Sequence, residues 1–344
     1  MSLGGRISEI AAVSSTTTAD ARRRTSDIIV LSGADLRRLM RFGDYVEAVA
    51  DAFRRHAEGA SVLPDPMHIP GDGGGFHVKA ARLGGYVAVK TNSNFPENAR
   101  RGLPTIQGAV LLFDAGGVPL ALIDSIEITT KRTGAATAVA ARYLARPDSR
   151  SVTICGCGAQ ARVQLEALRH GLDIRRVFAF DRDPKAAEAF AAEIAAQGIG
   201  AEVPKVLRAA TRESDVIVAC TTAHQPYLDV ADVRPGTFIA AIGADNPDKS
   251  EIAPALMAKA RVVTDVTALC AVMGDLHHAI AAGAMSQADI PAELGDLVAG
   301  RPGRASPDEI TLFDGCGVGI QDVAAAARAF ELARARGSGV TIAL

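Results

Sequence analysis

A glycine-rich turn is the first feature of this sequence that could carry chemistry. A short apolar run leads into Gly156-x-Gly158-x-x-Ala161, and a helical pattern follows at once. In a strand–turn–helix of this kind, the first glycine permits the tight turn and the second lets the backbone approach a pyrophosphate. The free N–H groups at the start of the helix attract the phosphate charge. The pattern therefore predicts a dinucleotide site that includes Gly156, Gly158, Ala159 and Gln160.

An acidic residue after the next strand supports this interpretation and bears on the choice of nucleotide. The apolar run 176–180 ends in Asp181, at roughly the ~20-residue offset of the acid that binds the adenosine ribose. This carboxylate would repel a ribose 2′-phosphate and so favours NAD, whereas Arg182 beside it could accept that phosphate. We therefore predict NAD as the cofactor and leave NADP as a possibility.

Polar residues also follow the later strands of the same pattern. Thr221 and Thr222 end the predicted strand 215–220, and Gly243 and Asp245 follow the next one. Open α/β sheets bind their ligands at the carboxyl ends of their strands, so the first three of these residues are predicted to line the cofactor. A carboxylate beside a cofactor can act as a general base or activate a water. Asp245 is therefore a candidate catalytic residue, although an Asp here could equally close a turn.

Two basic residues could bind a carboxylate. Lys90 ends a predicted strand, and Arg132 lies near the start of a predicted Ala-rich helix, 129–146. A cation in the first turn of a helix opposes the helix dipole, which is unfavourable unless the cation binds an anion. Arg132 with Lys90 on a nearby strand would suit a substrate carboxylate. The pattern alone leaves open the alternative that both are solvated surface cations.

The elements that must position these residues follow two patterns. Short β-like runs between 61 and 125 alternate with glycine turns, as is typical of hairpins. From 151 to 264 strands alternate with helices, which predicts a doubly wound parallel sheet. A final Ala-rich helix, 321–336, is expected to return to the first unit. The predicted fold class is therefore α/β, with a doubly wound parallel Rossmann sheet inserted into an α+β domain.

Composition excludes several classes of protein. The 344 residues are 48% hydrophobic, and 37 Lys and Arg stand against 39 Asp and Glu. Nucleic acids and anionic membranes attract basic surfaces, so neither is expected as a partner. An odd number of cysteines, two of them in the glycine turn, favours the reducing cytoplasm over a disulfide framework. No His/Cys spacing indicates a metal site, and residues 1–26 are expected to be a disordered extension.

Taken together, the motifs resemble the ornithine cyclodeaminase/mu-crystallin family. The matching stretches between Phe76 and Val323 include Lys90-x-x-Asn-x-x-Pro96, Gly102-Leu-Pro-Thr105, Arg132-Thr-Gly-Ala-Ala136, the glycine turn, Gly243-Ala-Asp245 with Lys249 and Glu251, and Thr311-x-Phe-Asp314. The resemblance implies an NAD(P)-binding domain inserted into a substrate-binding and dimerisation domain. We expect the former at 131–312 and the latter at 27–130 plus 313–344.

The resemblance also implies roles for individual residues. By motif position, Arg132 would bind the substrate carboxylate, Lys90 would lie at the α-carbon and the carboxylate, Thr105 would line the pocket, and Asp245 would be the base or water activator. Asp314 would lie near the nicotinamide.

The sequence departs from the family pattern near Pro66. Many members carry Arg or Lys shortly after a proline there, whereas this chain has Met67 and His68. The expected substitute is Lys79, or His77, on the next strand.

The activity that the resemblance implies is hydride transfer at the α-carbon of a small amino or imino acid, by a homodimer. Our first expectation is the conversion of L-ornithine to L-proline and ammonia. The alternatives are a reductase of cyclic imines such as pyrroline-2-carboxylate and an alanine dehydrogenase. A protein of a different class, a ligand carrier like mu-crystallin, would bind its ligand beside the nucleotide without turnover.

Overall fold

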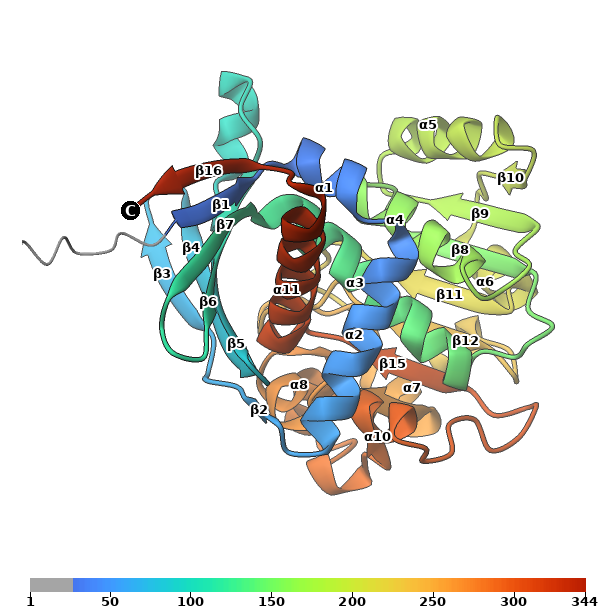
Figure 1. Ribbon diagram of the computed structural model, residues 1–344. Coiled ribbons are helices and arrows are strands. Elements are labelled where there is room, and N and C mark those ends of the chain that lie inside the picture. The colour runs from blue at the N-terminus through green and yellow to red at the C-terminus, as the bar shows by residue number, and fades with distance from the viewer. Residues whose placement is uncertain (1–26) are drawn as a thin grey trace, which may run out of the picture.

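Two eight-stranded sheets form the frame of the protein (Figure 1). The computed structural model describes residues 27–344, so the extension expected at 1–26 lies outside the described residues. The first sheet is mixed and runs in the order β16-β1-β7-β6-β5-β4-β2, with β3 paired to β4. Its strands are β1 (Asp27–Leu31), β2 (Ser61–Val62), β3 (Met67–Gly71), β4 (Gly74–Leu83), β5 (Tyr86–Asn94), β6 (Ile106–Asp114), β7 (Pro119–Asp124) and β16 (Val340–Ala343).

The second sheet is parallel throughout and runs in the order β10-β9-β8-β11-β12-β15-β13-β14. Its strands are β8 (Ser151–Cys155), β9 (Arg176–Phe180), β10 (Gly200–Glu202), β11 (Val216–Ala219), β12 (Phe238–Ala241), β13 (Arg261–Thr264), β14 (Ala292–Glu293) and β15 (Thr311–Asp314). Alternate residues of β11 belong to two separate apolar cores, one on each face of the sheet. The predicted α/β class with a doubly wound sheet is confirmed.

Three long helices, α2, α3 and α11, pack on one another beside the first sheet (Figure 1). Among these, α3 also packs against α4 of the parallel sheet, so it connects the two halves. The helices are α1 (Gly33–Leu39), α2 (Phe42–Ala57), α3 (Ser125–Leu144), α4 (Ala159–Arg169), α5 (Pro184–Ala195), α6 (Leu207–Glu213), α7 (Pro254–Lys259), α8 (Thr267–Met273), α9 (Asp275–Ala281), α10 (Leu294–Val298) and α11 (Gly319–Arg336), with short 3₁₀ turns η1 (Pro96–Arg101), η2 (Val230–Asp232) and η3 (Gln287–Asp289). None of the helices described between residues 27 and 344 has the length and apolarity that a bilayer crossing requires.

The start of α3 corrects one prediction. Its N-cap is Asp124, whose carboxylate accepts the Glu127 amide at 2.8 Å. Arg132 therefore lies beyond the second turn of the helix rather than in the first, and the dipole argument for an anion site at Arg132 was wrong. The start was hidden because the first turns contain β-branched residues, Ile126 among them, that are typical of strands.

Candidate active site

A cleft of about 790 Å³ separates the β3–β4 hairpin from the carboxyl edge of the parallel sheet. The hairpin contributes His68, His77 and Lys79 to its lining, and the loop after β12 contributes Asp245. Helix α8 and the segment 317–319 close the opposite side. The structure thus brings the sequence-predicted His77, Lys79 and Asp245 into one cavity.

Two lysines connect this cleft with a more deeply buried group. Lys79 on β4 and Lys90 on β5 are direct cross-strand partners, so their side chains lie on the same face of the sheet. The Lys79 ammonium donates to the carbonyl oxygens of Cys316 at 3.2 Å and Gly317 at 2.7 Å. Lys90 is buried behind it. Lys79 is therefore the lysine that meets solvent in the cleft.

Behind the cleft wall, Lys90 and Arg132 share one carboxylate. The Lys90 ammonium lies 2.7 Å from Asp322 Oδ2, and Arg132 Nε lies 3.1 Å from Asp322 Oδ1. The Arg132 Nη1 group also donates to the side chain of Gln321. A Cβ placed on Gly317 would lie 2.3 Å from Arg132 Nη1, so this cleft-lining glycine lets the guanidinium reach the cleft wall.

The Asp245 side chain is an accessible carboxylate of the site. It is 54% exposed, and its Oδ1 accepts from Lys249 Nζ at 2.7 Å. Its place inside the cleft opposes ionisation, but the Lys249 ammonium outweighs this and holds the pKa of Asp245 below its usual value. Asp245 is therefore an ionised carboxylate at neutral pH.

Two histidine rings line the mouth of the cleft. His68 and His77 are paired across β3 and β4, with ring centroids 4.7 Å apart. Burial, and then the neighbouring imidazole, lower the pKa of His77. His77 is thus neutral at physiological pH and is a weaker candidate than Lys79 for the basic residue that the family pattern lacks near Met67.

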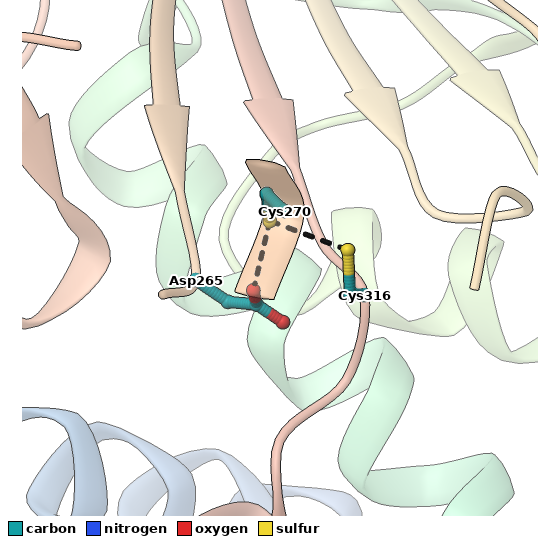
Figure 2. Close-up of side chains that lie close together, drawn as sticks. All are labelled: Asp265, Cys270 and Cys316. Carbon is teal, nitrogen blue, oxygen red and sulfur yellow. Dashed lines mark hydrogen bonds between the residues drawn. The ribbon is translucent and has the colours of Figure 1, made fainter. Parts of the chain in front are cut away.

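A buried cluster supports the segment that carries Gly317. Asp265 Oδ2 accepts the Gly317 amide at 2.6 Å, and Asp265 Oδ1 accepts from Cys270 Sγ at 3.2 Å. Figure 2 shows Asp265 and Cys270 together with Cys316, whose Sγ lies 3.3 Å from that of Cys270. The three side chains could together face a metal ion. Burial raises the pKa of the Asp265 carboxyl and of the Cys270 thiol, which keeps that thiol protonated as a donor to Asp265.

The glycine turn has the geometry that its sequence predicts. Gly156 has φ +93°, and a Cβ there would lie 2.8 Å from the Cys220 carbonyl oxygen, so only glycine fits. Nothing lies within 4 Å of the Cβ position of Gly158, which precedes α4 as its N-cap. Asp181 Oδ2 accepts the Cys157 amide at 2.7 Å. The turn therefore leaves open space at a helix N-terminus, with a carboxylate at the end of β9.

A second carboxylate joins the ends of β11 and β12. Glu251 Oε1 accepts the amide of Thr221 at 2.7 Å, and Oε2 accepts the amide of Gly243 at 2.8 Å. The hydroxyls of Thr221 and Tyr227 also donate to Oε1. Burial, and then the nearby Asp275 carboxylate, raise the pKa of Glu251 to about 7.

Other sequence-predicted residues take different places. Thr105 lies in the loop before β6, where its carbonyl accepts the Phe95 amide, and it is not among the residues that line the cleft. Asp314 is fully buried, and its carboxylate accepts the Leu276 amide at the start of α9. Thr222 and Arg182 are exposed beyond the ends of β11 and β9, at the edge where a nucleotide would lie.

Asp322 and Gln321 are site residues that the sequence reasoning missed. Asp322 lies 190 positions from Arg132 in the chain, so no local pattern joins them. One signal was present: both polar residues precede an Ala-rich run on a helix whose buried face includes them.

Comparison with known proteins assigns the fold to a family. The sequence model of the ornithine cyclodeaminase/mu-crystallin family matches residues 27–337. The chain belongs to this family. Among its relatives, the alanine dehydrogenase of Archaeoglobus fulgidus is 36% identical over 318 residues, which cover 92% of this chain and 98% of that protein.

Solved structures of the family align over most of the chain. An archaeal alanine dehydrogenase dimer with bound NAD has a TM-score of 0.88 at 36% identity and covers 92% of this chain and 99% of that one. The Δ1-pyrroline-2-carboxylate reductase of Thermococcus litoralis, in complex with NADH and L-proline, has a TM-score of 0.87 at 34% identity, with coverages of 92% and 100%. The iminosuccinate reductase of Paracoccus denitrificans, in complex with NAD⁺, has a TM-score of 0.87 at 31% identity, with coverages of 93% and 100%.

Proposed function

We propose that this family member is an NAD-dependent oxidoreductase that transfers a hydride between the cofactor and the α-carbon of a small amino or imino acid. The single observation that carries the proposal is the cleft in which Lys79 and Asp245 meet beside the carboxyl edge of the parallel sheet. The three solved relatives, each with NAD, NADH or NAD⁺ bound, support it.

The residues present fit a dinucleotide. The open space above Gly158 at the N-terminus of α4 suits a pyrophosphate, and Asp181 is placed to accept hydrogen bonds from a ribose. Thr221 and Gly243, held by Glu251, form the edge along which the nicotinamide half would run. When bound, the reduced nucleotide supplies the hydride. In this proposal residues 131–312 bind the nucleotide, and residues 27–130 with 313–344 bind the substrate.

The cleft would orient the substrate by its charges. Lys79, backed by Lys90 and Arg132, would hold the carboxylate, because paired ammonium and guanidinium donors suit that anion. Asp245, ionised and half exposed, would accept a proton from the substrate nitrogen as an amine is oxidised and return it in the reverse direction. Lys249 keeps that carboxylate ionised.

Among the versions of this reaction, we place a net amino-acid dehydrogenase or imine reductase before the cyclodeamination of L-ornithine, our first expectation from the sequence. The names of the similar proteins given above, a dehydrogenase and two reductases, support this order.

A substrate screen tests the proposal. Pyruvate with ammonia, pyrroline-2-carboxylate and L-ornithine are each incubated with NADH or NAD⁺, and absorbance at the nicotinamide band is followed with product analysis. We expect NADH consumption matched by amino-acid formation. Proline formed from ornithine without net NADH change would instead establish the cyclodeaminase. Tight carboxylate binding without turnover of any substrate would favour the carrier.

We further propose that two copies of the chain pair through the open face of the first sheet. Ala121 and Ile123 on β7 are buried beneath the helices, so Leu122 between them points to the opposite face, where it is 37% exposed. Phe76, Val340 and Ile342 are also exposed on strands of this sheet. The similar alanine dehydrogenase structure is described as a dimer. Light scattering should give a dimer mass that Leu122→Glu halves, whereas Val206→Glu on the exposed surface of the parallel-sheet half leaves it unchanged.

A further inference from the structure

Asp322 lies where three distant segments of the chain meet. It stands on α11, while its partners Lys90 and Arg132 come from β5 and α3. Each of its carboxylate oxygens faces a different cation, at 2.7 and 3.1 Å, and its side chain is 2% exposed. Asp322 therefore bridges Lys90 and Arg132, two cationic side chains from distant parts of the chain.

Without this carboxylate the two cations would repel each other in a buried site. Isolated charges are strongly unfavourable away from water, and they are tolerated when they are paired and hydrogen-bonded. With Asp322 in place and Lys90 protonated, these three side chains carry a net charge of +1. One substrate carboxylate balances a net charge of +1, whereas it would not balance the charge of +2 on two unpaired cations.

We propose that Asp322 is a positioning residue that organises Lys90 and Arg132 into one binding group for a monocarboxylate substrate. The inference rests on the proposed function and deepens it, since it names the residue that sets the charge and orientation of the substrate site. Asp322 acts through the two cations and does not itself touch the substrate.

Both cations retain donors for a ligand after Asp322 has bound them. An ammonium has three N–H groups, and one contact to Asp322 leaves Lys90 two of them. Arg132 uses Nε and Nη1 on Asp322 and Gln321, and within residues 27–344 no acceptor bonds to its Nη2. The guanidinium lies against Gly317, which lines the cleft. The bridge therefore orients the cations without using up their capacity to bind.

The protonation of Lys90 depends on this bridge. Three charged groups face its ammonium: Asp322 from α11, Arg132 from α3 and Lys79 from β4. Burial, aided by the two cations, lowers the pKa of Lys90 to about 7, and Asp322 is the group that opposes this fall. Removal of the Asp322 charge would leave Lys90 neutral at physiological pH.

The test compares wild-type and Asp322→Asn protein, each saturated with NADH, in calorimetric titrations with pyrrole-2-carboxylate, a planar carboxylate shaped like a cyclic imino acid. Affinity in the wild type should fall above about pH 7, where Lys90 loses its proton. In Asp322→Asn the fall should begin about 1 to 2 pH units lower, within the range by which a close opposite charge shifts a pKa. The variant should then bind roughly 10- to 100-fold more weakly at pH 7.5 and less than about fivefold more weakly at pH 5.5.

Two further variants separate positioning from folding. Asp322→Glu keeps the charge and should keep the wild-type pH dependence even if its affinity is lower, so it also serves if Asp322→Asn does not fold. Asp44→Asn removes a different carboxylate that pairs with α11 through Arg328 at 2.7 Å, and it should leave the titration unchanged. Equal weakening at every pH in Asp322→Asn, or a shifted profile in Asp322→Glu, would overturn the proposal. The titrations measure binding and not turnover. A protein that turned over no substrate would therefore refute the proposed enzymatic function, and the titrations would still decide the role of Asp322.

Discussion

Lys79 and Lys90 face each other across β4 and β5, with Lys79 lining the cleft and Lys90 buried behind it. Lys79 donates to two backbone carbonyls of the segment that follows β15, whereas Lys90 is held by a carboxylate of α11. The first sheet therefore carries one lysine that lines the cleft and a second lysine that is buried behind it.

Replacement of the accessible lysine should weaken substrate binding. For Lys79→Met we expect KM for the imino acid to rise roughly 10- to 100-fold, because a hydrogen bond to a charged group contributes about 1.5–3 kcal/mol. The change in kcat should be smaller. Steady-state kinetics at saturating NADH measures both constants. Lys131→Met removes a lysine that pairs with Glu166 at 2.6 Å on α4, and it should leave KM unchanged.

Asp245→Asn should act on turnover rather than on binding. Loss of a positioned acid–base group typically lowers kcat by roughly 10²- to 10⁴-fold, while the dissociation constant for NADH stays near that of the wild type. Asp248→Asn alters another carboxylate that lines the same cleft and should retain activity. Equal kcat in the two variants would remove Asp245 from the mechanism.

The pH profile should report on Lys249. Since its ammonium holds the pKa of Asp245 low, base-dependent activity is lost only as the pH falls through that low value. Lys249→Met raises the pKa, so the acid limb of kcat should move to higher pH. If the acid limb stays in place or moves to lower pH, the group whose titration controls kcat is not Asp245.

Asp181 should determine the choice between the two nucleotides. For Asp181→Ser we expect the affinity for NADPH relative to NADH to rise about tenfold or more, because juxtaposed like charges cost several kcal/mol. Fluorescence titration of both nucleotides provides the ratio. Asp183→Ser alters the next acid of the same loop, which caps α5, and should leave the ratio unchanged. NADPH bound more tightly than NADH by the wild type would contradict this assignment.

Glu251→Gln should change how stability depends on pH. The pKa of Glu251 is about 7 in the folded protein, above its ordinary value of 4.5. The folded state therefore holds a proton that the unfolded state releases between these values, and wild-type stability falls as the pH rises through this range. Gln does not titrate, and as both Glu251 oxygens accept hydrogen bonds, the variant should be less stable overall. In urea unfolding, the free energy of unfolding that the variant loses relative to wild type should be largest near pH 5 and smaller by pH 8. A loss that is the same at every pH would contradict a raised pKa of Glu251. Glu188→Gln, on an exposed position, is the control.

The features that sequence reasoning predicted well are local in the chain. Gly156, Gly158 and Asp181 belong to one strand–turn–helix–strand unit, whose spacing directly encodes its geometry. Lys79 was named, with His77 as the alternative, because the chain departs from the family motif near Pro66, and both residues line the cleft. The doubly wound parallel sheet followed from alternating strands and helices, but its strand order, with β15 between β12 and β13, was not predicted.

The features that were missed depend on contacts between distant segments. The partnership of Asp322 with Lys90 and Arg132 requires the packing of α11 and α3 beside β5, which no local pattern specifies. Thr105 carries a matching motif but is not among the residues that line the cleft. Its carbonyl accepts the amide of Phe95, whose neighbours Asn94 and Pro96 do line it, and such a position is set by tertiary contacts. The start of α3 was misplaced since β-branched residues follow an Asp N-cap that also ends a strand.

The direct test of the central claim is the fate of the hydride. NADH deuterated at both C4 positions is incubated with pyrroline-2-carboxylate, and with pyruvate and ammonia, and the amino-acid product is examined by mass spectrometry and NMR. Our account predicts one deuterium at the α-carbon for each NADH oxidised. Product without deuterium at that carbon, or substrate binding with no NADH oxidised in any reaction, would contradict it.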